Sequence, residues 1–561
     1  MSRTKPKIVR VIPLGGLEEI GRNMMLVEYG RDIVIIDMGI QFPEDDMPGI
    51  DYIIPNIEYL KGKEDRIQGI IITHGHYDHI AAIPYLIEKL HYPPIYATPL
   101  TRGIILKRQD DFPHLKPLEI HVINGETILR LGSITVEFFH VNHNIFGTMG
   151  VAIKTSVGTI VHTADFKFDN NPIGDEPADY AKMARIGSEG VLLLLSDSTG
   201  AEKPGHSVSE KTIQDNLEDL FRKNGGRIIV ATFASLITRI QQIITLSQKY
   251  GRKIAVDGYS MKSNVEIAHK LGYLKVDRGT FVNVKDIGGY PPSKVTILCT
   301  GAQGEGNAVL MRLVNKEHKF LSIQKGDTFI FSSSVVPGNE RAVQDLKDRI
   351  YRQGARVVHY GMMDIHASGH AHQEDLKMML NFMKPKFFMP IHGNYFMLRL
   401  HADLAEQVGI SPQNIVTPLN GQVVELSRDR IRTTRERVPA TYVMVDGLGV
   451  GDVGSVVFRD RQMMASDGMF VAIVIVDSKT GKVRGSPDII SRGFIYLREQ
   501  ESKKLLADVR KKVKEIVEET SSPEHTVNWV YVKDNLRDRI GQFLFSKTRR
   551  RPMVIPVVIE I

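Results

Sequence analysis

A run of seven residues, THGHYDH, constrains what this 561-residue chain can be more than any other feature. It places three imidazoles and one carboxylate, those of His74, His76, Asp78 and His79, directly behind an apolar run that ends at Ile72. A loop at a strand end can direct alternate side chains to different ions, and imidazole with carboxylate suits zinc or a similar cation that activates water. A surface cluster of histidines is the plain alternative. Four potential ligands in this order behind a buried strand favour a site for two adjacent metal ions.

The first 200 residues have the pattern of short strands joined by tight turns. LVEYGRDIVIID and AIKTSVGTIVHTAD are apolar runs broken by a glycine, which is typical of β-hairpins. The segment QGIIITHGHYDHIAAIPYLIEKL predicts a buried strand, a polar loop and then a helix. This part of the chain is therefore expected to be rich in antiparallel strands.

From about Ser209 to Tyr360 the pattern changes, because helical stretches alternate with compact β-branched strands such as RIIVATF and KVTILCTG. Such alternation is typical of βαβ units around a parallel sheet. EDLKMMLNFMKPKFFMPIHG then predicts a helix, a strand and a loop, and a charged helix is expected near Glu501 to Glu519. A length of 561 residues is too great for one hydrophobic core, so several domains are expected.

Composition limits the class of protein. The longest apolar stretches, such as Phe470 to Val476, are far shorter than the roughly 18 residues of a membrane helix, so no membrane association is expected. A single cysteine, Cys299, excludes an internal disulfide framework and suits a reducing, cytoplasmic location. The net charge of +7 and the pI of about 9.1 are compatible with a polyanionic partner, although charge alone is weak evidence.

HGHYDH matches the signature of the metallo-β-lactamase superfamily, and further motifs in order along nearly the whole chain resemble the β-CASP nucleases, within them the ribonuclease J family. These motifs are LLSDSTGAEKPGHSVSE, ATFAS, GRKIAVDGYSM, CTGAQGEGN, SSSVVPGNE, IHASGH, KPKFFMPIHGNY, RGFIYLRE and RRRPMVIPVVIEI. The resemblance implies an α/β fold, a metallo-β-lactamase αββα sandwich with an inserted β-CASP α/β domain and a small α+β C-terminal domain. It implies domains at 1–200 and 356–445 (the two parts of the metallo-β-lactamase domain), 201–355 (β-CASP) and 446–561 (C-terminal).

The resemblance also implies the metal ligands. One ion would be held by His74, His76 and His143, the second by Asp78, His79 and His392, with Asp165 bridging the two. From spacing alone, His140 and His162 are nearby competitors, and the family order favours His143 over His140. Imidazole-rich ligation favours two zinc ions per chain, although manganese could support activity at such a site.

Catalytic residues follow in the same way. The resemblance implies that His366 in DIHASGH supplies a proton to the leaving oxygen and that Asp197 in SDST orients this histidine by accepting a hydrogen bond. Asp78 counts both as a ligand and as part of the catalytic set. The residue types alone would also suit structural roles, with Asp197 as a turn cap and His366 at the edge of a core.

Ser235, Ser368, Gly369 and His370 resemble a pocket that holds the phosphate of a 5′-terminal nucleotide. Hydroxyls, backbone N–H groups beside glycine and an imidazolium are good phosphate donors.

The chain departs from the family pattern at four named positions, and the motifs CTGAQGEGN and HTADFK also differ slightly from it. Tyr77 stands where an acidic residue is common, Leu236 and Thr238 where asparagine and histidine are usual, and Tyr259 where arginine is usual. Tyr77 is not a ligand position, so the metal set stays complete. Leu236 and Thr238 replace two polar neighbours that the family usually has beside this pocket, so weaker recognition of the terminal phosphate is expected.

The function implied is that of a metal-dependent ribonuclease that cuts single-stranded RNA from the 5′ end and internally, in RNA maturation and mRNA decay. The resemblance further implies a homodimer or homotetramer assembled through the C-terminal domain, and partner proteins of RNA decay. Three alternatives compete: a DNA-directed β-CASP nuclease, a small-molecule hydrolase of the same superfamily and a non-catalytic RNA-binding scaffold. The insertion of about 150 residues argues against the second, and the intact ligand set argues against the third.

Overall fold

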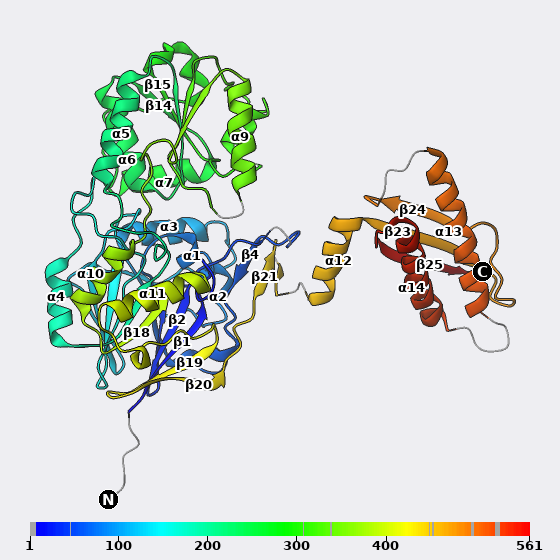
Figure 1. Ribbon diagram of the computed structural model, residues 1–561, viewed down its shortest axis with the longest axis horizontal. Coiled ribbons are helices and arrows are strands. Elements are labelled where there is room, and N and C mark those ends of the chain that lie inside the picture. Colours follow the sequence, from blue (N-terminus) through cyan, green and yellow to red (C-terminus); the bar gives the residue numbers. More distant parts are fainter. Residues whose placement is uncertain are drawn as a thin grey trace, which may run out of the picture. The chain divides into compact units, whose positions relative to one another are not determined.

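The computed structural model describes residues 7–44, 47–306, 308–336, 339–447, 449–451, 454–494, 499–521 and 528–561. Parts of three sequence motifs lie outside the described residues: Asn307 of CTGAQGEGN, residues 337–338 of SSSVVPGNE and residues 495–498 of RGFIYLRE. The chain forms two compact units, one of Met1–Gln41 with Ile53–Val443 and the other of Phe42–Tyr52 with Met444–Ile561 (Figure 1). Within the described residues, no helix combines the length and the apolarity needed to cross a membrane.

Two facing sheets form the base of the first unit. The eight-stranded sheet has the order β20-β19-β1-β2-β3-β5-β6-β7 and the six-stranded sheet the order β18-β12-β11-β10-β9-β8. The strands of the first are β1 (Val9–Gly15), β2 (Met24–Tyr29), β3 (Asp32–Ile36), β5 (Ile67–Ile71), β6 (Ile95–Ala97), β7 (Ile120–Val122), β19 (Gln422–Leu426) and β20 (Ile431–Arg437). Those of the second are β8 (Ile128–Leu131), β9 (Ile134–His140), β10 (Met149–Lys154), β11 (Thr159–His162), β12 (Val191–Asp197) and β18 (Phe387–Ile391).

Successive side chains of a strand point to opposite faces of the sheet, and the six-stranded sheet has apolar residues on both faces. On β12, Leu193 and Leu195 face a core shared with the first sheet, whereas Leu194 faces a core built with helices. The helices that supply that second core are α4 (Tyr180–Glu189), α10 (Gln373–Met383) and α11 (Tyr395–Gln407). Two hairpins expected from glycine turns, β2–β3 and β10–β11, are confirmed as antiparallel pairs.

The helix expected after HGHYDH is present as two short pieces, α1 (Tyr77–Ile80) and α2 (Ile83–Leu86). Pro84 stands in the first turn of α2, where its missing N–H is tolerated, and it favours the start of a new helix there. The longer α3 (Pro99–Gln109) follows β6. Three 3₁₀ turns lie outside the inserted sheet region: η1 (Glu58–Leu60), η2 (Glu64–Arg66) and η5 (Pro412–Asn414).

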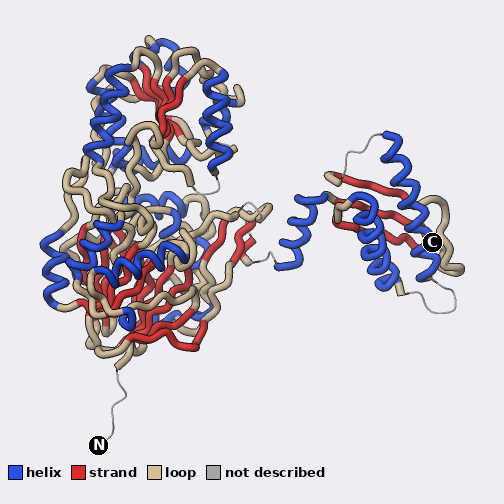
Figure 2. Tube along the Cα trace, in the orientation of Figure 1, coloured by secondary structure: helices blue, strands red, loops and turns tan. Residues whose placement is uncertain are grey.

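Between β12 and α10 the chain builds a five-stranded sheet of order β14-β15-β13-β16-β17, and all its pairings are parallel, as the sequence predicted. Its strands are β13 (Ile228–Ala231), β14 (Lys253–Val256), β15 (Val295–Cys299), β16 (Thr328–Phe331) and β17 (Arg356–His359). The sheet therefore extends to His359, past the expected domain boundary at residue 355. Figure 2 shows its strands enclosed by helices on both sides. The helical elements here are α5 (Glu210–Lys223), α6 (Ile237–Lys249), α7 (Tyr259–Lys270), η3 (Val284–Gly289), η4 (Pro292–Lys294), α8 (Val309–Val314) and α9 (Glu340–Arg352).

The second unit has its own core. One face of the sheet β24-β23-β25 packs on helices α13 (Glu499–Thr520) and α14 (Trp529–Thr548) through residues such as Phe470, Val474 and Leu536. The strands are β23 (Met469–Val476), β24 (Asp488–Arg492) and β25 (Met553–Glu560), preceded by α12 (Ser455–Asp467). The expected charged helix is confirmed as α13, and the terminal run MVIPVVIE forms β25. Short strands β4 (Tyr52–Ile54), β21 (Val443–Asp446) and β22 (Gly449–Val450) complete the elements described here.

The topology brings several strand ends to one edge of the sandwich. β11, β12 and β18 run parallel as neighbours, so their carboxyl ends lie together, and so do those of β3 and β5. The residues at or just after these ends include Asp165, Asp197, His392, Asp37 and His74.

Candidate metal centre

Three imidazole nitrogens meet at the first part of the centre. His76 Nδ1 lies 3.0 Å from His74 Nε2 and 3.1 Å from His143 Nε2. One proton can serve only one of these contacts, so the remaining lone pairs face each other across a short distance. Such an arrangement is satisfied by a cation bound among the three nitrogens, and their nature suits zinc.

The second part contains two carboxylates and two imidazoles. His79 Nε2 and His392 Nε2 both lie 3.4 Å from Asp78 Oδ2. The ligand atoms of Asp78, His79, Asp165 and His392 all lie within 4.8 Å of one another, which is close enough to hold one metal ion.

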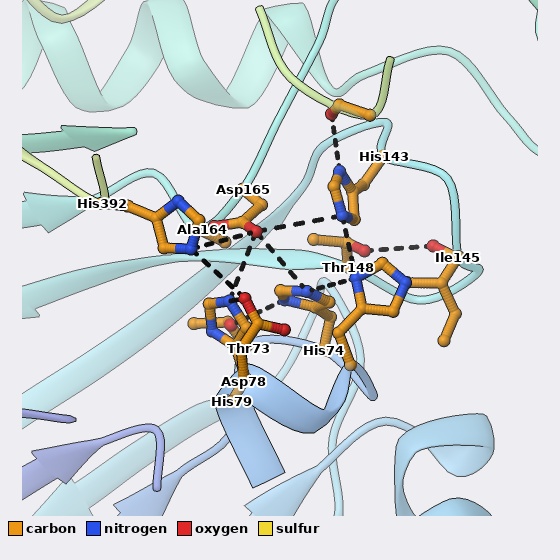
Figure 3. Close-up of polar contacts among 12 residues, drawn as sticks. Thr73, His74, Asp78, His79, His143, Ile145, Thr148, Ala164, Asp165 and His392 are labelled. Atoms are coloured by element: carbon orange, nitrogen blue, oxygen red, sulfur yellow. Dashed lines mark hydrogen bonds and ion pairs between the residues drawn. The ribbon is translucent and has the colours of Figure 1, made fainter. Parts of the chain in front are cut away.

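Asp165 lies between the two parts (Figure 3). Its Oδ2 is 3.3 Å from His79 Nε2 and 3.8 Å from His392 Nε2, and it is also 3.8 Å from His74 Nε2 and 3.9 Å from His143 Nε2. One carboxylate therefore faces imidazoles of both groups.

The far nitrogens of these imidazoles fix which nitrogen faces the centre. His79 Nδ1 donates to Asp37 Oδ2 at 2.7 Å and His143 Nδ1 to the Gly369 carbonyl at 2.6 Å. His74 Nδ1 lies 3.0 Å from Thr73 Oγ1, and His392 Nδ1 lies 2.7 Å from Thr199 Oγ1. Each hydroxyl donates onward to another oxygen, so it is free to accept from the imidazole. Anchors of this kind orient metal-binding histidines and raise their basicity.

The backbone is strained where the ligands turn inward. Asp37, Ala164 and His392 have φ of 61°, 58° and 52°, a left-handed conformation that residues other than glycine rarely adopt. All three follow the ends of strands that carry the site, namely β3, β11 and β18. The surrounding fold thus holds this geometry against the local preference of the chain.

Burial and charge set the protonation of the centre. Burial lowers the pKa of the His74 and His143 imidazoles well below their usual range and that of His76 to about 4, so these three are neutral ligands at pH 7. Burial also opposes charge on His392, but the carboxylates of Asp165, Asp197 and Asp78 outweigh it and raise its pKa to about 10. The carboxylates of Asp165, Asp197 and Asp78 therefore favour a positive charge beside them. A bound divalent cation would supply that charge when the imidazoles are neutral.

The two competing histidines lie outside both ligand groups. His140 Nε2 contacts the Glu176 carbonyl at 3.1 Å and lies 3.6 Å from Asp175, away from the centre. His162 Nδ1 accepts a hydrogen bond from the N–H of Ala164 at 3.0 Å. Both are therefore engaged in local structure, and His143 is the histidine of this region that faces the other ligands.

Asp197 does not pair with His366, the partner expected from the sequence. Its Oδ2 accepts a hydrogen bond from His370 Nδ1 at 2.8 Å, and its Oδ1 lies 3.5 Å from His392 Nδ1. Burial, with the nearby charge of Arg239, lowers the pKa of His366 to about 3, and no described group bonds its buried Nδ1. His370 lies beside the candidate metal ligands, since its ring stacks on that of His392 with 5.6 Å between the centroids. It is therefore a better candidate for proton transfer than His366.

Three of the four residues expected to bind phosphate form one turn beside the centre. The Ser368 hydroxyl accepts from the His370 N–H at 3.2 Å, and a β-carbon at Gly369 would lie 2.4 Å from His143 Cε1, so this position requires glycine. Ser235 stands in the loop before α6, and no contact among the described residues links its hydroxyl to this turn. Leu236 and Thr238 are 2% and 4% exposed.

Sequence reasoning missed the residues that hold the ligands. Asp37 is 1% exposed and accepts from the Thr73 N–H at 2.8 Å and from the Thr73 hydroxyl at 2.9 Å, besides His79. Thr199 supports His392 in a similar way. The sequence showed only an aspartate, Asp37, at the end of the buried strand DIVIID. A polar residue at that position also fits the start of a loop, so its role as a partner of His79 could not be predicted.

We expect Asp37→Asn to weaken metal binding by about 10- to 100-fold, because a carboxamide is a poorer acceptor for the His79 N–H. Asp32→Asn is the control, since Asp32 lies at the other end of β3 and bonds Ser133 on the surface. Competition with a chromogenic chelator measures both affinities. Equal affinities for Asp37→Asn and the unmodified protein would remove Asp37 from the site.

Models of four protein families match this chain in succession. They are "Metallo-beta-lactamase superfamily" over residues 17–231, "Ribonuclease J, beta-CASP domain" over 225–350, "Zn-dependent metallo-hydrolase RNA specificity domain" over 355–418 and "Ribonuclease J C-terminal domain" over 456–561. A solved structure of a protein of unknown function from Enterococcus faecalis V583 covers 75% of this chain and 100% of its own, with a TM-score of 0.53 and 16% identity. That similarity supports the fold alone.

Curated relatives match end to end. Ribonuclease J2 of Bacillus subtilis (strain 168) is 39% identical over 561 residues, covering 100% of both chains. Ribonuclease J 2 of Staphylococcus epidermidis (strain ATCC 12228 / FDA PCI 1200) and of Staphylococcus aureus (strain N315) are each 39% identical over 560 residues, covering 100% of this chain and 99% of the relative. With the αββα sandwich, the inserted parallel α/β sheet and the C-terminal domain all present, this chain belongs to the ribonuclease J family of metallo-hydrolases.

Proposed function

We propose that this protein is a ribonuclease that uses two divalent metal ions to hydrolyse single-stranded RNA, both from the 5′ end and internally, in RNA maturation and mRNA decay. The observation that carries the proposal is the position of Asp165 between two ligand groups, in a chain that ribonuclease J relatives match along its whole length. The same centre on a small-molecule hydrolase would not need the inserted α/β domain.

His74, His76 and His143 would hold one ion, Asp78, His79 and His392 the other, and Asp165 would contact both. Two divalent ions supply charge neutralisation on the phosphate oxygens and lower the pKa of the attacking water. Five imidazoles favour zinc over harder cations, and manganese is the alternative. The protein's own part is to fix this geometry through Asp37, Thr73, Thr199 and Gly369.

The departing oxygen of the cut nucleotide needs a proton. We assign this role to His370, because Asp197 accepts the hydrogen bond from its Nδ1 and leaves Nε2 for the substrate. His366, which does not bond Asp197, would be a supporting residue of this segment. The turn of Ser368, Gly369 and His370 would also contact phosphate, since its hydroxyl, backbone and imidazole are suitable donors.

RNA is favoured over DNA as the substrate by the relatives and by the RNA specificity domain model. The direct test is incubation of purified protein with 5′-labelled RNA and DNA oligonucleotides of matched sequence, with and without a chelator. We expect metal-dependent cleavage of the RNA. Equal cleavage of the DNA would favour a DNA-directed nuclease, and binding without cleavage would favour an RNA-binding scaffold.

We expect a weak preference for 5′-monophosphate ends. Leu236 and Thr238 are buried and offer no charge or amide to a phosphate, and a missing contact of that kind costs about 1 to 3 kcal/mol. Cleavage rates of RNAs that begin with monophosphate, hydroxyl or triphosphate measure the preference, and Leu236→Asn with Thr238→His should sharpen it. Strong discrimination by the unmodified protein would show that these two positions do not read the phosphate.

We also propose a division of labour in which residues 1–200 and 356–445 carry the metals, 201–355 covers the substrate and 446–561 drives self-association into dimers or tetramers. The face of the C-terminal sheet opposite α13 and α14, as far as its residues are described, supports the last point. Ile475, Ile490, Val557 and Ile559 on its three strands are 36–44% exposed. An exposed apolar sheet face of this kind favours contact with another chain.

Removal of residues 446–561 should lower the assembly state while leaving the metal centre folded, because this segment holds none of the proposed ligands and has its own core. Light scattering measures the mass, and elemental analysis measures the metal. If the truncated protein has the same number of chains per particle as the full-length protein, the proposed role of this segment in assembly is wrong.

A further inference from the structure

A network of buried charges lies behind the metal residues. The side chains of Lys167, Asp169, Glu210 and Arg239 are each 1–4% exposed, yet they come from both the metal-bearing sandwich and the inserted domain. Lys167 and Asp169 follow the proposed bridging ligand Asp165, whereas Glu210 begins α5 and Arg239 lies on α6. Burial of so many charges costs free energy unless each is paired and bonded.

All three guanidinium nitrogens of Arg239 donate hydrogen bonds. Nε donates to Gln242 Oε1 at 2.6 Å, Nη2 donates to Glu210 Oε2 at 2.8 Å, and Nη1 donates to both the Ser332 hydroxyl and the Ile365 carbonyl, the latter at 2.7 Å. The Ser332 hydroxyl donates to the same Ile365 carbonyl at 2.6 Å. Two donors from the inserted domain thus hold one carbonyl oxygen.

That carbonyl lies immediately before the turn that faces the metal centre. Residues 366–370 follow it, and this turn makes two contacts with the site: the Gly369 carbonyl accepts from His143 Nδ1, and His370 donates to Asp197. The position of the turn therefore depends at one end on the donors to Ile365 and at the other on His143 and Asp197.

The other side of the network holds the loop that carries Asp165. Lys167 Nζ donates to Glu210 Oε1 at 3.1 Å, and the Glu210 N–H donates to Asp169 Oδ2 at 2.8 Å. The Lys167 N–H donates to the carbonyl of Asn142, the neighbour of His143, at 2.8 Å. Glu210 thus joins Arg239 to the ligand loops at 142–143 and 165–169.

A structural role alone does not account for this placement. Buried ion pairs contribute little net stability relative to apolar groups, and their best-attested use is to fix one arrangement among several. The inserted domain has a second buried pair, Arg227 with Asp327, at the opposite ends of its strands, where Arg227 Nε and Nη2 donate to the carboxylate at 2.8 and 2.6 Å. That pair touches no residue of the metal centre.

We propose that Arg239, joined through Glu210 to Lys167, is a positioning residue of the reaction: it sets the 366–370 turn, and with it His370, against the metal centre. This inference rests on the proposed function, because it assigns Arg239 an effect through the proton donor. Arg239 itself contacts neither the substrate nor the ligands.

The test compares Arg239→Lys with Arg227→Lys in the full-length, metal-loaded protein. Lysine keeps the positive charge but cannot reach all four acceptors of Arg239. Melting temperature, metal content and kcat are measured, the last for a single-stranded RNA and for bis(4-nitrophenyl) phosphate, whose leaving group departs without a proton. We expect Arg239→Lys to keep both metals, to lose at least about tenfold in kcat on RNA and to hydrolyse the nitrophenyl ester almost normally. Arg227→Lys should lose stability but keep kcat on both substrates.

Ser332→Ala is the second variant, in case Arg239→Lys does not fold, since it removes one donor to the Ile365 carbonyl and no charge. It should show a smaller loss on RNA with the ester unaffected. Normal kcat on RNA in the folded variants, or parallel losses on both substrates, would overturn the positioning role. Unmodified protein that hydrolyses the ester but not RNA would instead contradict the proposed function.

Discussion

Replacing Asp165 with asparagine should abolish RNA cleavage and reduce bound metal. Its Oδ2 lies within 3.9 Å of four imidazole nitrogens from both ligand groups, so loss of its charge disturbs both ions at once. Ions in such sites supply several kcal/mol of transition-state stabilisation, so we expect a loss of about 10³-fold or more. His76→Ala should lose less, because His76 belongs to one group only.

Asp175→Asn is a suitable control for this variant. Asp175 is also a partly buried carboxylate beside a histidine, His140, but it lies outside the ligand groups. Elemental analysis and cleavage rates compare the two. Full metal occupancy in Asp165→Asn would contradict its assignment as the shared ligand.

Replacing His370 with alanine should reduce RNA cleavage by at least about 10²-fold while the protein keeps its metals, since this is the scale of a positioned proton donor. His366→Ala should have a much smaller effect, because His366 does not bond Asp197 and its buried Nδ1 bonds no described group. From the motif DIHASGH, the sequence suggested the opposite result, in which the loss of His366 has the larger effect on the cleavage rate. The result expected from the structure depends on a single contact, from His370 Nδ1 to Asp197 Oδ2.

Single-turnover cleavage of RNA by both variants measures this difference. Asp197→Asn in the His370→Ala background supplies a second check: if Asp197 acts through His370, the double variant is hardly slower than His370→Ala alone. A large loss in His366→Ala with normal turnover in His370→Ala would return the role to His366.

The sequence was sufficient for the main elements and for the residues that gather at the metal centre. HGHYDH contains four potential ligands within six residues, and the strands before Asp165 and His392 are apolar runs whose ends could be placed in advance. Parallel pairing of β11, β12 and β18 then brings these distant residues to one edge, and this pairing was not predicted, because the βαβ pattern was seen only from about Ser209 to Tyr360. The hairpins and the parallel inserted sheet follow from local patterns.

Contacts that depend on tertiary geometry could not be predicted. His366 and His370 are four residues apart in one turn, and only the fold decides which of them faces Asp197. Asp37 and Arg239 have ordinary sequence neighbours, and their roles arise from contacts with residues distant in the sequence, His79 for Asp37 and Ile365 for Arg239. The break between α1 and α2 was missed because the apolar spacing of IAAIPYLI suits one helix, whereas Pro84 favours two.

Titration of metal-stripped protein with zinc, and in parallel with manganese, tests the central claim most directly. Cleavage of a 5′-labelled single-stranded RNA is followed at each addition, together with a DNA of the same sequence. If the proposed centre binds two ions, RNA cleavage reaches its maximum at two equivalents per chain, with Asp165→Asn inactive throughout and the DNA intact. Full activity at one equivalent, or cleavage by the stripped protein, would contradict the two-ion proposal.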